Sequence, residues 1–261
     1  MSAVRLVTFN VHHGVGDDGR HDLTRLARVL SHADPDVVCL QEVDRHYGER
    51  SEFADQALLL SRALDRELVW SPSIDEPPRA GRTERRQYGN ALLSRLPVLT
   101  SEVHRLPGAG EPRSALRALV RLPDGALWVT ATHLSSHSAT DRAAQAAAVA
   151  ALSADAPGVL VGDLNADAGA SELGVLRERF ADAWPLAAGP DPQTGRFSLR
   201  ARLESRQRAR KGLTHPARRP RVRIDQVWMS PGVTVTDARV LDGAGASDHH
   251  PLLVDLQVTV P

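Results

Sequence analysis

The order of the apolar runs along the chain is the feature that most constrains its fold. Short apolar runs that are typical of buried strands alternate with stretches in which apolar residues recur at helical spacing. The alternation continues through all 261 residues, without an internal repeat or a change of composition that would mark a linker. It predicts one α/β domain over residues 1–261, in which mixed sheets are covered by helices.

The apolar patterns give approximate bounds for the elements. Strands are expected at residues 4–11, 37–42, 68–70, 91–93, 98–99, 115–122, 127–133, 158–161, 222–229, 233–241 and 252–260. Helices are expected at 23–30, with Asp22 as N-cap, and at 53–64, 139–154 and 171–180. Residues 71–87, rich in Pro, Arg and Glu, are interpreted as a loop, and residues 185–220 show little periodicity.

Composition excludes some functional classes. No apolar run approaches the ~20 residues of a membrane span, and no signal peptide is visible before the first apolar run. The single cysteine, Cys39, lies in an apolar run and is expected to be a buried thiol, so a cytoplasmic location is expected. The net charge is zero, yet residues 196–223 carry eleven Arg or Lys against one acid, Glu204.

Groups that can bind a metal or move a proton occur where the predicted strands end. Such ends are where α/β folds build their sites. Hydrolysis of a phosphate ester needs a cation, a base for water and help for the leaving oxygen, and Mg²⁺ prefers carboxylates and water. The residues that supply these groups at or after strand ends are Asn10, His12, Glu42, His133, Asp163 and Asn165. Asp225 lies inside an apolar stretch, and Asp248 and His249 precede the last strand.

Each of these residues also has an ordinary structural explanation. Asp163, Asn165 and Asp248 could cap turns, and Asp225 could be a buried acid with one hydrogen-bond partner. Their occurrence together, each at a strand end, is what favours phosphate-ester chemistry with a divalent metal.

Five short sequence motifs in the chain, called words below, resemble those of the endonuclease/exonuclease/phosphatase superfamily. This superfamily includes deoxyribonucleases, exonuclease III-like repair enzymes, neutral sphingomyelinases and inositol polyphosphate 5-phosphatases. The words are Gln41-Glu42-Val43-Asp44, Tyr88-Gly89-Asn90, Gly162-Asp163-Leu164-Asn165, Arg223-Ile224-Asp225 and Ser247-Asp248-His249-His250-Pro251. The opening Asn10-Val11-His12-His13-Gly14 is most similar to a broad bacterial group described as metal-dependent hydrolases. The resemblance implies a four-layer sandwich: two packed mixed β-sheets flanked by helices.

The resemblance also implies a role for each site residue. Glu42 would be the main metal ligand, with Asn10 and Asp248 completing the shell. Asp163 would position or deprotonate water, and Asn165 would hydrogen-bond the phosphate. His249, oriented by Asp225, would contact the phosphate or move a proton, and His133 would support the phosphate and leaving group. His12, Tyr88 and Asn90 are the expected substrate-binding residues.

His12 departs from part of the superfamily, because exonuclease III-like members often carry an acid there. Imidazole is a poorer ligand for magnesium than for manganese, zinc or iron. The expected cofactor is Mg²⁺, and His12 makes Mn²⁺ a possible alternative. His12 could instead donate a hydrogen bond to the phosphate.

Three functions stay open from the sequence. The leading hypothesis is a divalent-metal-dependent phosphodiesterase. The second is a nuclease that holds DNA or RNA with the Arg-rich residues 196–223. The third is a non-catalytic module that binds a phosphate ligand or nucleic acid. The oligomeric state is not predicted.

Overall fold

Two six-stranded sheets form the centre of the molecule. The computed structural model describes residues 1–152, 157–187 and 212–259. In the first sheet the strand order is β11 (Val233–Val240), β12 (Leu252–Val258), β1 (Ser2–Asn10), β2 (Val37–Arg45), β4 (Arg86–Ser94) and β3 (Glu67–Glu76). In the second it is β5 (Val98–Arg105), β6 (Ser114–Leu122), β7 (Gly125–His133), β8 (Gly158–Asp163), β10 (Asp225–Met229) and β9 (Ala181–Asp182).

Both sheets are mixed, because one pair of neighbouring strands in each is parallel. These pairs are β1 with β2 and β7 with β8, whereas the other pairings are antiparallel. A parallel pair ends at the same edge of its sheet, so side chains that follow the two strands come together. The expected two-sheet sandwich is confirmed.

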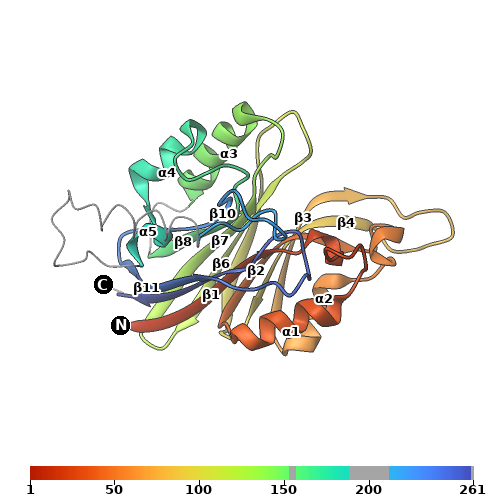
Figure 1. Cartoon of the computed structure of the whole chain (residues 1–261), viewed down its shortest axis with the longest axis horizontal. Coiled ribbons are helices and arrows are strands. Elements are labelled where there is room, and N and C mark those ends of the chain that lie inside the picture. The colour runs from red at the N-terminus through yellow and green to blue at the C-terminus, as the bar shows by residue number, and fades with distance from the viewer. Residues whose placement is uncertain (153–156, 188–211, 260–261) are drawn as a thin grey trace.

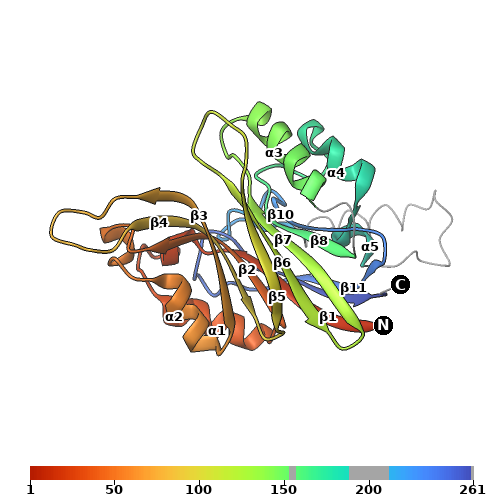
Figure 2. The same cartoon turned by 180° about the vertical axis from the view of Figure 1, so that it is seen from behind.

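Helices cover the outer faces of the sheets (Figures 1 and 2). On the first sheet lie α1 (Leu23–Ala33) and α2 (Gln56–Leu64), whose Leu26, Leu30 and Leu60 pack against the sheet. On the second lie α3 (Ala139–Leu152) and α4 (Gly174–Arg179), and α5 (Ala183–Leu186) is one short turn. Single 3-10 turns are η1 (His12–Gly14), η2 (Glu49–Ser51) and η3 (Ser171–Leu173). Among the described residues, no helix has the length and apolar character needed to cross a membrane.

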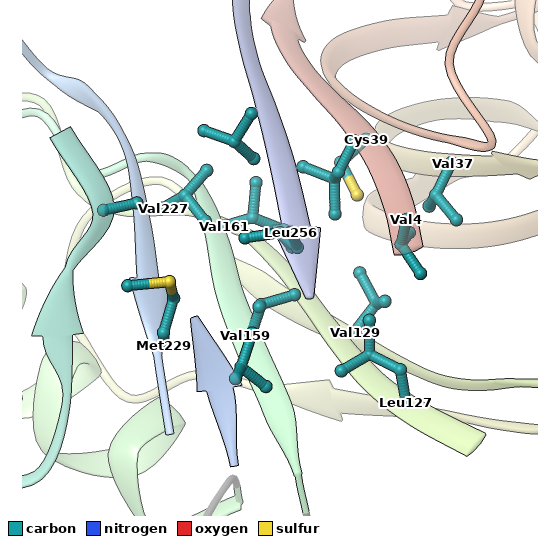
Figure 3. Packing of buried hydrophobic residues seen from close by; sticks show 14 of the residues in the cluster. Val4, Val37, Cys39, Leu127, Val129, Val159, Val161, Val227, Met229 and Leu256 are labelled. Carbon is teal, nitrogen blue, oxygen red and sulfur yellow. The ribbon is translucent and has the colours of Figure 1, made fainter. Parts of the chain in front are cut away.

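The main core lies between the two sheets and follows from the two-residue period of the strands. In β2, Val37 and Cys39 point into this core, whereas Val38 and Leu40 point outward beneath α1 and α2. Figure 3 shows side chains of both sheets meeting in the inner layer, Cys39 among them. The expectation that Cys39 is a buried thiol is confirmed.

Three sequence expectations are corrected. Residues 71–87 are not one loop, since β3 and β4 pair as far as Glu76 with Arg86. This hairpin is polar because β3 is an edge strand, so its sequence shows no apolar run. The helix expected at 171–180 is divided into η3 and α4, and the one expected from Phe53 begins at Gln56, after its N-cap Asp55.

Candidate functional site

Three neighbouring strands of the second sheet place functional side chains side by side. His133 ends β7, Asp163 ends β8 and Asp225 begins β10, and in the register of the sheet His133 and Asp225 both lie opposite Asp163. All three side chains are buried. The sheet thus brings together residues that are up to 92 positions apart, 133 against 225.

Gly162 allows β7 and β8 to approach at this point. A Cβ at Gly162 would lie 1.9 Å from the carbonyl oxygen of Thr132, and the residue has φ of +145°. Any side chain here would separate the strands just before Asp163. The glycine of the Gly162-Asp163-Leu164-Asn165 word is therefore a packing requirement.

Asn10 links the two sheets. Its Nδ2 donates to Glu42 Oε1 and to Asp163 Oδ2, both at 3.0 Å, and its Oδ1 accepts from the backbone N–H of His12. Glu42 lies at an irregularity in the pairing of β2 with β4 and has φ of +57°, in the left-handed region. This local distortion, a costly one for a non-glycine residue, directs its carboxylate toward the site.

The loop before β12 carries the remaining pair. Ser247 Oγ donates to the carbonyl of Asn10 at 2.7 Å and accepts from the backbone N–H of His249 at 3.2 Å, which fixes the loop against β1. His249 Nδ1 lies 2.8 Å from Asp225 Oδ2, and its Nε2 lies 3.7 Å from Asp163 Oδ2. Asp225 is thus placed to orient the imidazole.

The charges in this buried part shift the pKa values of His249 and Asp163. Burial alone would lower the pKa of His249, but the charge and hydrogen bond of Asp225, together with Asp163, raise it to about 10. Burial and the neighbouring Asp225 raise the pKa of Asp163 to about 6, although His249 and Asn10 oppose the shift. A carboxyl group that titrates near neutrality can accept a proton from water.

Imidazoles surround the two more exposed carboxylates. His13 Nδ1 lies 3.8 Å from Glu42 Oε2, while His12 Nδ1 and His215 Nε2 lie 3.9 and 3.8 Å from the oxygens of Asp248. Burial would raise the pKa values of both carboxyl groups, but the adjacent imidazoles lower them, so both carboxylates are ionised at neutral pH.

The donor set fits a divalent cation. Asp248 accepts a long hydrogen bond of 3.4 Å from Ser247 Oγ, and its imidazole neighbours stand 3.8–3.9 Å away, beyond hydrogen-bond range. The buried His13 Nδ1 has no hydrogen-bond partner. Two groups of ligand atoms, from His215, Asp248 and His249 and from Asp163, Asp225 and His249, each lie within 4.8 Å of one another. Carboxylates suit Mg²⁺, and the added imidazoles also suit Mn²⁺.

His133 and Asn165 form the opposite wall of the site. Asn165 has φ of +51°, and its Nδ2 lies 2.9 Å from His133 Nε2 and 3.0 Å from the carbonyl of Leu134. His133 Nε2 is 3.5 Å from Asp163 Oδ2, and the backbone N–H of Asn165 donates to Asp163 Oδ1 at 2.9 Å, so the two expected phosphate-side residues contact different oxygens of Asp163.

The three residues expected to bind substrate are placed differently. The His12 side chain is 36% exposed beside Asp248. Tyr88 is buried, and burial and the negative charge of Glu42 raise its pKa. Asn90 is buried and donates through Nδ2 to the carbonyl of Ser114 at 3.1 Å, so this amide joins β4 to β6.

Two residues near the site received no role from the sequence. The His215 ring lies against that of His249, with centroids 4.5 Å apart, and Arg113 Nη1 contacts His133 Nδ1 at 2.9 Å. The short word Gly212–Pro216 marked the neighbourhood of His215, but nothing distinguished Arg113 among 32 Lys and Arg residues.

Solved structures with similar folds come from several organisms. An endonuclease/exonuclease/phosphatase from Beutenbergia cavernae has 26% identity and a TM-score of 0.74, over 99% of this chain and 72% of that one. A Bacteroides thetaiotaomicron mannosyl-6-phosphatase has 17% identity and a TM-score of 0.72 (97% and 99% covered). The human nocturnin catalytic domain with bound sulfate has 20% identity and a TM-score of 0.70 (99% and 94% covered).

Sequence comparison identifies the family directly. No match is found among proteins with curated descriptions. The model of the Endonuclease/Exonuclease/phosphatase family matches residues 7–249, which span the site from Asn10 to His249. Members of this family are metal-dependent hydrolases of phosphoester bonds. With the two-sheet sandwich and the clustered carboxylates and imidazoles, this match establishes that the chain belongs to the endonuclease/exonuclease/phosphatase family.

Proposed function

We propose that this chain is a divalent-metal-dependent phosphodiesterase that cleaves a P–O bond by attack of an activated water. The observation that carries the proposal is the environment of Asp163 Oδ2. This oxygen lies 3.0 Å from Asn10 Nδ2, 3.5 Å from His133 Nε2 and 3.7 Å from His249 Nε2. Donors thus surround a buried carboxylate whose pKa is raised, an arrangement that supports water activation.

The two carboxylates of Glu42 and Asp248 would hold the cation, Mg²⁺ or Mn²⁺. Asn10 holds Glu42 in place through its hydrogen bond to Oε1. When bound, the cation would neutralise charge on the phosphate oxygens and the leaving oxygen.

His249 and Asp163 divide the proton transfers between them. Asp163 accepts the proton of the attacking water, while the raised pKa of His249 keeps its imidazole protonated at neutral pH. His249 therefore neutralises phosphate charge or donates a proton to the leaving oxygen. Asn165 and His133 contact the phosphate from the opposite side.

An assay on an activated phosphodiester, bis(p-nitrophenyl) phosphate, tests the proposal with Mg²⁺, with Mn²⁺ and after chelation. Metal-dependent turnover is expected, with kcat reduced about 10³-fold in Asp163→Asn. Asp237→Asn is the matched control, because Asp237 is exposed on β11 and pairs with Arg239. Turnover that is unchanged in Asp163→Asn would overturn the assignment.

The same assay on p-nitrophenyl phosphate separates a diesterase from a monoesterase. The diester is expected to be the better substrate. Hydrolysis of the monoester alone would contradict the proposed diesterase activity but would still be consistent with a metal-dependent phosphoester hydrolase.

The nuclease alternative depends on the Arg-rich segment. Residues 196–211 of that segment, with Arg206, Arg208 and Arg210, lie outside the described residues. Within the described part, Arg223 is committed to an ion pair with Asp182, and Arg218 contacts Asp17. No contact of the described residues favours nucleic acid over a smaller phosphodiester, so the diesterase is the function proposed.

A further inference from the structure

Arg113 constrains the protonation of His133. The arginine directly precedes β6, its side chain is 5% exposed, and its Nη1 lies 2.9 Å from His133 Nδ1. A guanidinium remains protonated and has only N–H donors. The contact is therefore a hydrogen bond only if His133 Nδ1 carries a lone pair.

A neutral imidazole can accept at only one of its two nitrogens, and both Arg113 Nη1 and Asn165 Nδ2 are donors at 2.9 Å. The charged guanidinium makes the stronger bond, so Nδ1 is the acceptor and the proton of the neutral ring lies on Nε2. His133 Nε2 faces Asn165 Nδ2 at 2.9 Å and Asp163 Oδ2 at 3.5 Å. The donation of Asn165 Nδ2 to the carbonyl of Leu134 fixes which end of the carboxamide faces the ring. Two N–H groups, His133 Nε2–H and Asn165 Nδ2–H, thus converge and lack a common acceptor.

We propose that Arg113 is a positioning residue that holds His133 in the neutral Nε2–H tautomer, so that His133 and Asn165 together donate two hydrogen bonds to one phosphate oxygen. The identity of this ligand as a phosphate rests on the proposed function. Convergent donors aimed at a site of developing negative charge are a recurrent means of stabilising it. In this arrangement His133 binds the oxygen and does not supply a proton to the leaving group.

The contrast with His249 supports this assignment. The imidazoles of His133 and His249 lie 3.5 and 3.7 Å from the same oxygen of Asp163. The partner of His249 Nδ1 is the carboxylate of Asp225, which accepts a hydrogen bond, whereas the partner of His133 Nδ1 is the guanidinium of Arg113, which donates one. Burial and the charge of Arg113 lower the pKa of His133 to about 3. Proton transfer to the leaving group is therefore left to His249.

The tautomer can be read without any assay of turnover. In ¹⁵N-labelled protein, ring-nitrogen chemical shifts distinguish a protonated from a bare nitrogen, and His133→Gln identifies the signals of His133. The wild-type protein is expected to show a protonated Nε2 and a bare Nδ1 from about pH 5 to pH 8, both after chelation and with Mg²⁺. A protonated Nδ1 in this range would overturn the proposal.

Substitution of Arg113 tests its part in the arrangement. Arg113→Met is expected to release His133 into a mixture of tautomers and to lower kcat/KM about 10²-fold. Arg113→Lys keeps a charged donor and is expected to restore part of both. The matched control is Arg117→Met, which should leave His133 unchanged. Arg117 lies on β6, the strand that Arg113 precedes, and its guanidinium stands over the Trp128 ring, 3.6 Å from the centroid. An unchanged tautomer in a folded Arg113→Met protein would contradict the proposal.

Inorganic phosphate tests the two-donor pocket directly. Its addition is expected to shift the His133 Nε2–H and Asn165 side-chain amide signals together, and to do so less in Arg113→Met. Shifts at neither group would remove the phosphate pocket. If the protein shows a single Nε2–H tautomer of His133 and phosphate-induced shifts but hydrolyses no phosphate ester, that result would uphold this inference and reject the proposed function.

Discussion

The two sheets contribute unlike halves to the site. The half from the second sheet is buried and tightly bonded: Asp163 and Asp225 are 2% and 0% exposed, and Asp225 holds His249 at 2.8 Å. The half next to the first sheet is open: Glu42 and Asp248 are 23% and 40% exposed, and their imidazole neighbours stand 3.8–3.9 Å away. The buried half is preorganised by protein contacts, whereas the open half leaves charged oxygens for an external cation.

This difference teaches how the site divides its work. Groups that move protons or bind a developing charge gain from burial, which strengthens their interactions and fixes their geometry. A cation that must enter and exchange needs exposed carboxylates that keep an oxygen available to it. Asp248 and His249 are adjacent in the chain and belong to opposite halves, so one loop couples them.

The largest expected effect comes from the buried half. His249→Gln removes the imidazolium while keeping a polar side chain, and kcat is expected to fall about 10³-fold with little change in the metal concentration required. Steady-state kinetics across a metal titration measure both quantities. His104→Gln, at a half-exposed histidine on β5, is the control. A large rise in the metal requirement would show that the halves are not separate.

A smaller and different effect is expected from the open half. Glu42→Gln should raise the metal concentration for half-maximal activity at least about tenfold, with much of kcat recovered at saturating metal. Mg²⁺ at about 100 times its Kd stabilises the folded state by about 2.7 kcal/mol. Thermal unfolding of Glu42→Gln should therefore show little of the Tm increase that Mg²⁺ gives the wild-type protein. A normal metal requirement with a lost kcat would refute the division.

The smallest expected effect concerns stability against pH in metal-free protein. The folded pKa of His249, about 10, exceeds its ordinary value of 6.5. The stabilisation is therefore complete below about pH 6.5 and is lost as the pH rises through about 10. Asp225→Asn removes the main charge that raises this pKa, so the decline of Tm from pH 7 to pH 10 should be shallower by roughly 4 °C.

Asp182→Asn is the matched control for that measurement. Asp182 is also a largely buried carboxylate, its side chain 12% exposed, but its partner is the guanidinium of Arg223 and not an imidazole. Its loss should lower Tm by a similar amount at both pH values. An equally steep decline of Tm in Asp225→Asn would contradict the raised pKa of His249.

The sequence predicted the strands that are buried on both faces, and with them the places of Asp163, Asp225 and His249. Their apolar runs are continuous, and the polar residue lies at or beside one end of its run: Asp163 ends β8, Asp225 begins β10 and His249 precedes β12. The β3–β4 hairpin was missed because an edge strand needs no apolar run, and its pairing of Glu76 with Arg86 involves two polar residues.

The parts of the site that the sequence could not predict depend on contacts across strands. Arg113 acquires its place only because β6 and β7 pair in the register that sets Ala115 opposite Thr132. The tautomer of His133 depends on that contact, and neither residue type indicates it in the sequence. The resemblance to a family predicted that His133 lies near the phosphate, but which ring nitrogen carries its proton depends on the contact with Arg113.

Gly162 shows that a signature word can carry two kinds of information. The glycine satisfies the spacing between two strands, since a Cβ would lie 1.9 Å from a carbonyl oxygen of β7, while Asp163 supplies chemistry. A relative that had abandoned catalysis would still need the glycine to fold but would be free to replace the aspartate. In a genome survey, the glycine therefore identifies the architecture, and only the residue after it indicates whether an enzyme remains.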